Sequence, residues 1–153
     1  MKIEILSQRH YGEPKLKMPK ELKGIVKSGT VPFGAKCKCP VYITKTHIYL
    51  KHRDYFSPSI SMPQAKEAGI IDKWNPKFIY NDNFGSVVLR CEAWIRIPKL
   101  IFEQYKSLFI LRYRLCIEMA CAIGIQEDFL FNYDWTHMFE ELIKIYKDEL
   151  DKD

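Results

Sequence analysis

Residues 86–97 constrain the fold of this chain more than any other stretch, because their apolar side chains fall on every second position. A period of two is that of a β-strand with one face in the core. The apolar row consists of Val87, Leu89, Cys91, Ala93, Ile95 and Ile97, and the opposite row of Ser86, Val88, Arg90, Glu92, Trp94 and Arg96. Residues 77–80, followed by the loop 81–85, predict the first arm of a hairpin that this strand completes.

Two further stretches predict strands. Residues 1–7 alternate apolar with charged side chains, and residues 41–52 are rich in β-branched and aromatic residues. Between them, residues 19–28 predict a short helix that follows Pro19. Residues 30–40 predict a loop because two prolines and a glycine interrupt them.

The C-terminal third predicts two helices. Residues 99–124 have helical spacing with one narrow polar strip, so this long hydrophobic helix is expected to be the central packing element. Residues 135–151 carry one apolar stripe, with Asp134 as the expected N-cap. Strands followed by helices predict an α+β fold, in which a small, mostly antiparallel sheet is packed by the long helix and a C-terminal amphipathic helix.

A length of 153 residues predicts one domain, residues 1–153, with a basic, strand-rich part (1–97) and a helical part with an acidic end (98–153). The longest apolar stretch, residues 107–125, holds three charges, which argues against a membrane span. The first ten residues lack the apolar region of a secretory leader. Five cysteines, an odd number, favour a reducing cytoplasm over a disulfide framework.

The net charge of +5 is distributed unevenly along the chain. Residues 1–57 carry 12 Lys and Arg against 4 Asp and Glu, whereas residues 125–153 carry 3 against 9. Such polarity steers an acidic partner to the basic end. The alternatives are that the two ends attract each other or that the acidic end keeps the protein soluble.

Basic and aromatic residues alternate in the middle of the chain and on the polar row of the 86–97 strand. Lysine and arginine neutralise phosphates, and flat rings stack on unpaired bases, so such a sheet face is suited to nucleic acid. An ordinary solvated face with a cation–π cluster is the alternative. The candidate residues are Lys36, Lys38, Lys45, Tyr49, Lys51, Arg53, Arg90, Trp94 and Arg96.

Arg112 is the tenth candidate anion-binding residue. It falls on the apolar side of the predicted long helix, where an unpaired charge is costly. It therefore needs a carboxylate, backbone carbonyls or an acidic ligand. An ion pair within the protein is the favoured interpretation, and an anion pocket the functional one.

A zinc site is a further candidate because Cys37, Cys39, His47 and His52 supply a Cys2His2 ligand set. One observation opposes it. In a regular strand over residues 41–52, the two histidines are five positions apart and point to opposite faces. No cofactor is otherwise expected.

The stretch 129–135 alternates four aromatic residues, which indicates core closure or a protein-binding surface. Phosphate-binding, dinucleotide-binding and hydrolase motifs are absent. The leading hypothesis is therefore a small, non-enzymatic module that binds nucleic acid or a nucleoprotein complex. The alternatives are a protein–protein inhibitor or adaptor, such as viruses and mobile elements encode, and a small enzyme with a metal or phosphate site in residues 37–53.

Overall fold

The computed structural model describes residues 2–9, 14–34, 37–54, 60–61, 79–81, 86–89, 91–123 and 130–152. The elements in chain order are β1 (Glu4–Arg9), the 3-10 helix η1 (Lys20–Leu22), β2 (Gly29–Phe33), β3 (Cys37–Ile43), β4 (His47–Asp54), β5 (Ile60–Ser61), β6 (Ile79–Asn81), β7 (Ser86–Leu89), β8 (Cys91–Pro98), α3 (Lys99–Gln104), α4 (Leu108–Ile123) and α6 (Tyr133–Asp151). Together they form the α+β fold that the sequence predicts.

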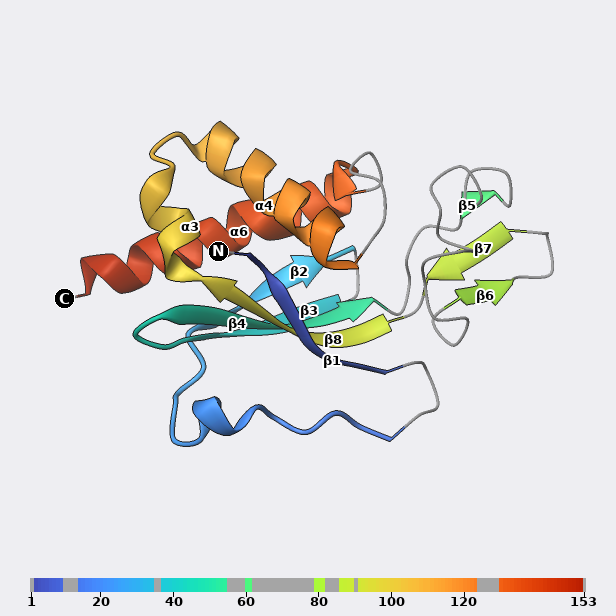
Figure 1. The fold of residues 1–153 in the computed structure, drawn as a ribbon, viewed down its shortest axis with the longest axis horizontal. Coiled ribbons are helices and arrows are strands. Elements are labelled where there is room, and N and C mark those ends of the chain that lie inside the picture. The colour runs from blue at the N-terminus through green and yellow to red at the C-terminus, as the bar shows by residue number, and fades with distance from the viewer. Residues whose placement is uncertain are drawn as a thin grey trace.

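Five strands form the main sheet in the order β1-β8-β4-β3-β2, and every neighbouring pair is antiparallel. The described helices α3, α4 and α6 cover one face of this sheet, which we call the inner face (Figure 1). The hydrophobic core lies between them. At the edge strand, a Cβ added to Gly29 would lie 3.0 Å from Cδ1 of Ile145, so α6 approaches β2 closely.

The pattern of residues 86–97 is confirmed where it enters the main sheet. Ala93, Ile95 and Ile97 of β8 are buried on the inner face. The expected single strand is nevertheless divided, because β7 belongs to a second sheet with the order β5-β7-β6. The predicted hairpin is present in that sheet as the β6–β7 pair.

The expectation of a loop over residues 30–40 is wrong, since the described residues of this stretch belong mainly to β2 and to the start of β3. Both prolines occupy positions where a strand tolerates a missing N–H. Pro32 lies in an edge strand, and Pro40 precedes Val41, the first β3 residue paired with β4.

The expected strand over residues 41–52 is a hairpin of two strands, β3 and β4. The turn between them is closed by Thr44, whose N–H donates to the carbonyl of His47 at 2.9 Å. The His47 N–H donates to Oγ1 of Thr44 at 3.1 Å. The turn contains no Gly, Pro or Asn, so the usual sequence signals of a turn are missing.

The long helix expected over residues 99–124 is interrupted at residues 105–107, which separate α3 from α4. Ser107 immediately precedes α4, and its carbonyl accepts from the N–H of Leu111 at 2.9 Å. The last helix is confirmed, but it begins at Tyr133 and its N-cap is Asn132, whose side chain accepts from the N–H of Trp135.

The helix expected over residues 19–28 is reduced to the three residues of η1. Gly24 follows at a φ of 81°, a left-handed conformation that ends a helix and that glycine adopts without strain. Residues 14–28, which we call the strap, instead run across the outer face of the main sheet, on the side opposite the helices (Figure 1).

Candidate nucleic-acid interface

The outer face of the main sheet brings five of the predicted residues together. β4 and β8 are adjacent, and their register places Tyr49 opposite Arg96, Lys51 opposite Trp94 and Arg53 opposite Glu92. These side chains share one face because they occupy alternate positions of each strand. The expected basic-aromatic face therefore exists as an arrangement of residues.

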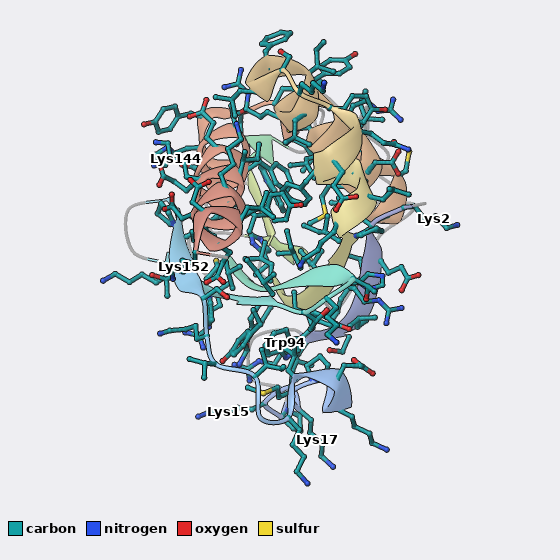
Figure 2. All side chains as sticks on the ribbon, turned by 90° about the vertical axis from the view of Figure 1, so that its left-hand side faces the viewer. Lys2, Lys15, Lys17, Trp94, Lys144 and Lys152 are labelled. Carbon is teal, nitrogen blue, oxygen red and sulfur yellow. The ribbon has the colours of Figure 1, made fainter. Side chains whose placement is uncertain are left out.

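The aromatic members of this face are covered, which the sequence does not predict. Tyr49 and Trp94 are each only 2% exposed, and they form a small buried cluster with Leu22 of the strap. Leu16 and Tyr42 pack against the same cluster. Figure 2 shows Trp94 between the sheet and the strap. Neither ring is accessible for stacking while the strap is in this position.

Two of the cations on this face are engaged with carboxylates. Glu92 is buried, and its Oε1 lies 3.0 Å from Nζ of Lys51, whereas its Oε2 lies 2.7 Å from Nη2 of Arg9. The Lys51 ammonium is also 5.8 Å from the centre of the Trp94 ring, a cation–π distance. Arg9 is a member of the site that the sequence analysis missed.

Arg96 donates to Glu4 of β1, and hydrogen bonds to Glu4 and Tyr49 raise its pKa. Burial lowers the pKa of His47 at the start of β4, and the charge of Arg96 lowers it further. The cations of the sheet itself are therefore partly neutralised by the protein.

Three N–H groups of this face are buried without an acceptor among the described residues. They are Nε1 of Trp94, Nε of Arg53 and Nε of Arg96. Buried donors are normally paired, so an unpaired set on one face needs an explanation.

The strap carries a second set of cations, which the sequence analysis did not place in the site. Its five lysines are all exposed, and none forms an ion pair with a described carboxylate. They are Lys15, Lys17, Lys20, Lys23 and Lys27, against the single acidic residue Glu21. Lys15 and Lys17 point away from the sheet (Figure 2). The lysine density of residues 14–28 was the signal that could have identified them.

The remaining basic candidates are scattered. Lys38 and Lys45 are exposed, on β3 and in the β3–β4 turn. Lys36 and Arg90 lie outside the described residues. Arg112 lies on the helical side of the sheet and donates to Glu140 of α6, so its charge is paired within the protein.

The four proposed zinc ligands do not converge. Cys37, Cys39 and His52 are buried with the core on the inner face, whereas His47 belongs to the opposite row of β4 and hydrogen-bonds Thr46. The Cys39 thiol lies 3.4 Å from the Arg53 N–H. Over the described part of the chain, no three His, Cys, Asp or Glu side chains are grouped to hold a metal ion.

The helical layer presents a different surface, in which apolar side chains are exposed. They are Leu108, Phe109, Ile110, Tyr113, Phe131 and Tyr133. A cavity of about 360 Å³ opens among Phe109, Arg112, Tyr113, Cys116, Phe131 and Thr136. The rings of Tyr113 and Phe131 are stacked at 5.2 Å. Burial raises the pKa of Cys116 to about 12, so its thiol is neutral at physiological pH.

Comparisons with known proteins add no functional information. No protein-family model, curated protein or solved structure matches the chain. Within the described segments, no helix combines the length and apolar character needed to cross a bilayer.

Proposed function

We propose that this protein binds nucleic acid by contacting the phosphate backbone with the lysines of the strap. The observation that carries the proposal is the exposure of five strap lysines that have no described carboxylate partner. Lysines of this kind release counterions from a polyanion, which drives binding without reading the sequence.

The strap is better suited to this contact than the strands beneath it. On the strands, Lys51 and Arg96 are already paired with Glu92 and Glu4. A phosphate would have to displace those carboxylates, whereas it meets the strap lysines directly. The residues that we propose to contact phosphate are therefore Lys15, Lys17, Lys20, Lys23 and Lys27. The exposed Lys38 and Lys45 are further candidates.

The salt dependence of binding gives the size of the effect. If all five strap lysines neutralise phosphates of a duplex, the plot of log affinity against log salt has a slope of about −4.5. Raising the salt from about 50 to about 200 mM then weakens binding by a factor of roughly 500.

The experiment is an anisotropy titration of labelled DNA and RNA at those two salt concentrations, with a matched pair of variants. The strap variant carries Lys15→Gln, Lys17→Gln and Lys23→Gln. The control variant carries Lys144→Gln and Lys147→Gln on α6 and Lys152→Gln at its C-cap, and so loses the same charge on the other side of the sheet (Figure 2). We expect the strap variant to bind at least about tenfold more weakly at low salt and to lose about 2.7 units of slope. Equal losses in both variants, or no binding by the unaltered protein, would overturn the proposal.

A second candidate function is docking to a partner protein, as an adaptor or inhibitor. The exposed aromatic surface of α4 and α6, with its cavity, favours it because large apolar patches mark interaction sites. Such docking persists at high salt and is lost on Phe109→Ser or Tyr133→Ser exchange, whereas strap lysine variants leave it unchanged. A metal-dependent enzyme in residues 37–53 has no such supporting group of side chains.

The compartment that we propose is a reducing one. Four cysteines whose side chains are described, namely Cys37, Cys39, Cys116 and Cys121, are free thiols. Free thiols persist where disulfides do not form, which supports the cytoplasm.

A further inference from the structure

The described contacts that hold the strap to the outer face are one apolar cluster and two hydrogen bonds. Leu22 is its one fully buried residue among residues 14–28, with Leu16 packed beside it. The Tyr49 hydroxyl donates to Oε2 of Glu21 at 3.3 Å, and the Ser28 N–H donates to the Val41 carbonyl at 2.8 Å where the strap enters β2. Segments with few buried apolar contacts open at a low free-energy cost.

The apolar residues of the strap differ in how far they are exposed to solvent. Leu22 is 1% exposed, whereas Val26 is 84% exposed and Met18 about half exposed. The cover over the sheet therefore depends on Leu22, with Leu16 beside it, rather than on the strap as a whole.

The surface beneath the strap has the features of a platform for unpaired bases. Tyr49 and Trp94 lie on adjacent strands, and Tyr42 lies 5.9 Å from Trp94 between ring centres. Lys51 and Arg96 flank these rings in the register. Aromatic rings for stacking beside cations for phosphate are the combination that holds single-stranded nucleic acid.

With the strap in place, three hydrogen-bond donors on this face of the sheet lack an acceptor among the described residues. The N–H groups at Nε1 of Trp94, Nε of Arg53 and Nε of Arg96 are buried, and no described atom accepts from them. Leu16 and Leu22, which pack in the cluster with Tyr49 and Trp94, offer only hydrocarbon side chains. A base or a phosphate carries acceptor atoms of the kind that these donors lack.

We propose that the strap is a lid over a binding site for single-stranded nucleic acid. When the strap swings away, bases stack on Trp94 and Tyr49, while Lys51 and Arg96 stay paired with Glu92 and Glu4. The strap lysines then bind the same strand from its outer side. This inference rests on the proposed function and adds to it a preference for unpaired bases and an intramolecular control of access.

The test compares a variant that loosens the strap with a matched one that does not. Leu22→Ser removes the buried anchor without changing charge, and Val26→Ser makes the same kind of exchange at an exposed position of the strap. Tyr49→Phe is a second loosening variant, because it keeps the ring and removes the hydroxyl that donates to Glu21. Circular dichroism of each variant establishes that the sheet and helices are retained.

The probes are an oligothymidylate of about 20 nucleotides and a duplex of equal length. Apparent affinity scales with the open fraction, so Leu22→Ser should bind the single strand about fivefold or more tightly than the unaltered protein. Duplex affinity should change by less than about twofold, because its bases are not available to stack. Val26→Ser should behave as the unaltered protein does.

Tryptophan emission locates the contact. Stacked bases should quench the emission of Trp94 in the Leu22→Ser variant, and the quenching should disappear when Trp94→Phe is added. If single strand and duplex gain affinity alike, or if quenching survives Trp94→Phe, the lid is refuted while the strap-lysine function stands. If no variant binds either probe, the proposed function itself fails.

Discussion

His52 provides the sharpest test of the packing on the inner face. Its ring is 1% exposed and lies between Phe33 and Trp135, each 4.6 Å away between ring centres. Neither ring nitrogen has a hydrogen-bond partner among the described residues. Burial lowers the pKa of His52 to about 3, because a charged imidazolium loses its hydration there.

The sign of the pH dependence follows from that direction. The folded protein binds the proton more weakly than the unfolded chain, whose histidine pKa is about 6.5. The contribution of neutral His52 to stability is therefore complete above pH 6.5 and is lost as the pH falls towards 3. Each pH unit below 6.5 costs about 1.4 kcal/mol, so going from pH 7 to pH 5 lowers the free energy of unfolding by about 2 kcal/mol.

Urea denaturation at pH 7 and pH 5 measures this loss. A His52→Leu variant cannot take up the proton, so it should lose about 2 kcal/mol less than the unaltered protein over that interval. His137→Gln is the control, since His137 is stacked on the exposed Tyr133 on α6. Equal losses in the unaltered and His52→Leu proteins would show that the imidazole is solvated or hydrogen-bonded in the fold.

Three further predictions concern single side chains. Glu92→Gln should lower the free energy of unfolding by about 3 kcal/mol in urea, because it leaves two cations beside a neutral group in a buried site. A double-mutant cycle of Arg112→Leu and Glu140→Leu should give a coupling of about 1 kcal/mol or less, since both side chains are partly exposed. Iodoacetamide at neutral pH should alkylate the exposed Cys121 and spare Cys116, as mass spectrometry of the peptides would report.

The parts of the fold that could be predicted are those with a long periodic signal. The alternation through Ala93, Ile95 and Ile97 placed β8 correctly, and the apolar stripe of residues 135–151 placed α6. The missed boundaries depend on single polar side chains. Thr44 closes a hairpin, and Ser107 accepts from the first turn of α4, through hydrogen bonds that leave no apolar pattern to detect.

Of the candidate site, the residues on the strands could be predicted, but Arg9, the strap lysines and the burial of the rings were missed. Period two alone places Tyr49, Lys51 and Arg53 on one face of a strand. Their neighbours across the sheet, and the covering Leu22, depend on contacts between residues far apart in sequence. The sequence pattern alone predicts that Trp94, on the outer face, is exposed to solvent. It is buried because the strap crosses it.

The fold places the basic strap and the acidic helix α6 on opposite faces of the main sheet. The strap crosses the outer face of the sheet, whereas α6, with six carboxylates against three lysines over residues 133–152, packs over the inner face (Figure 1). The sheet lies between these two surfaces, and charges separated by more than a Debye length of about 8 Å are largely screened from each other. The strap lysines are therefore not neutralised by α6.

An approaching polyanion is attracted on the strap side and repelled by α6, so its orientation is selected before contact. By the same argument, the proposed docking surface on α4 and α6 does not attract a polyanion, so salt should weaken binding at the proposed strap site and not docking at this surface.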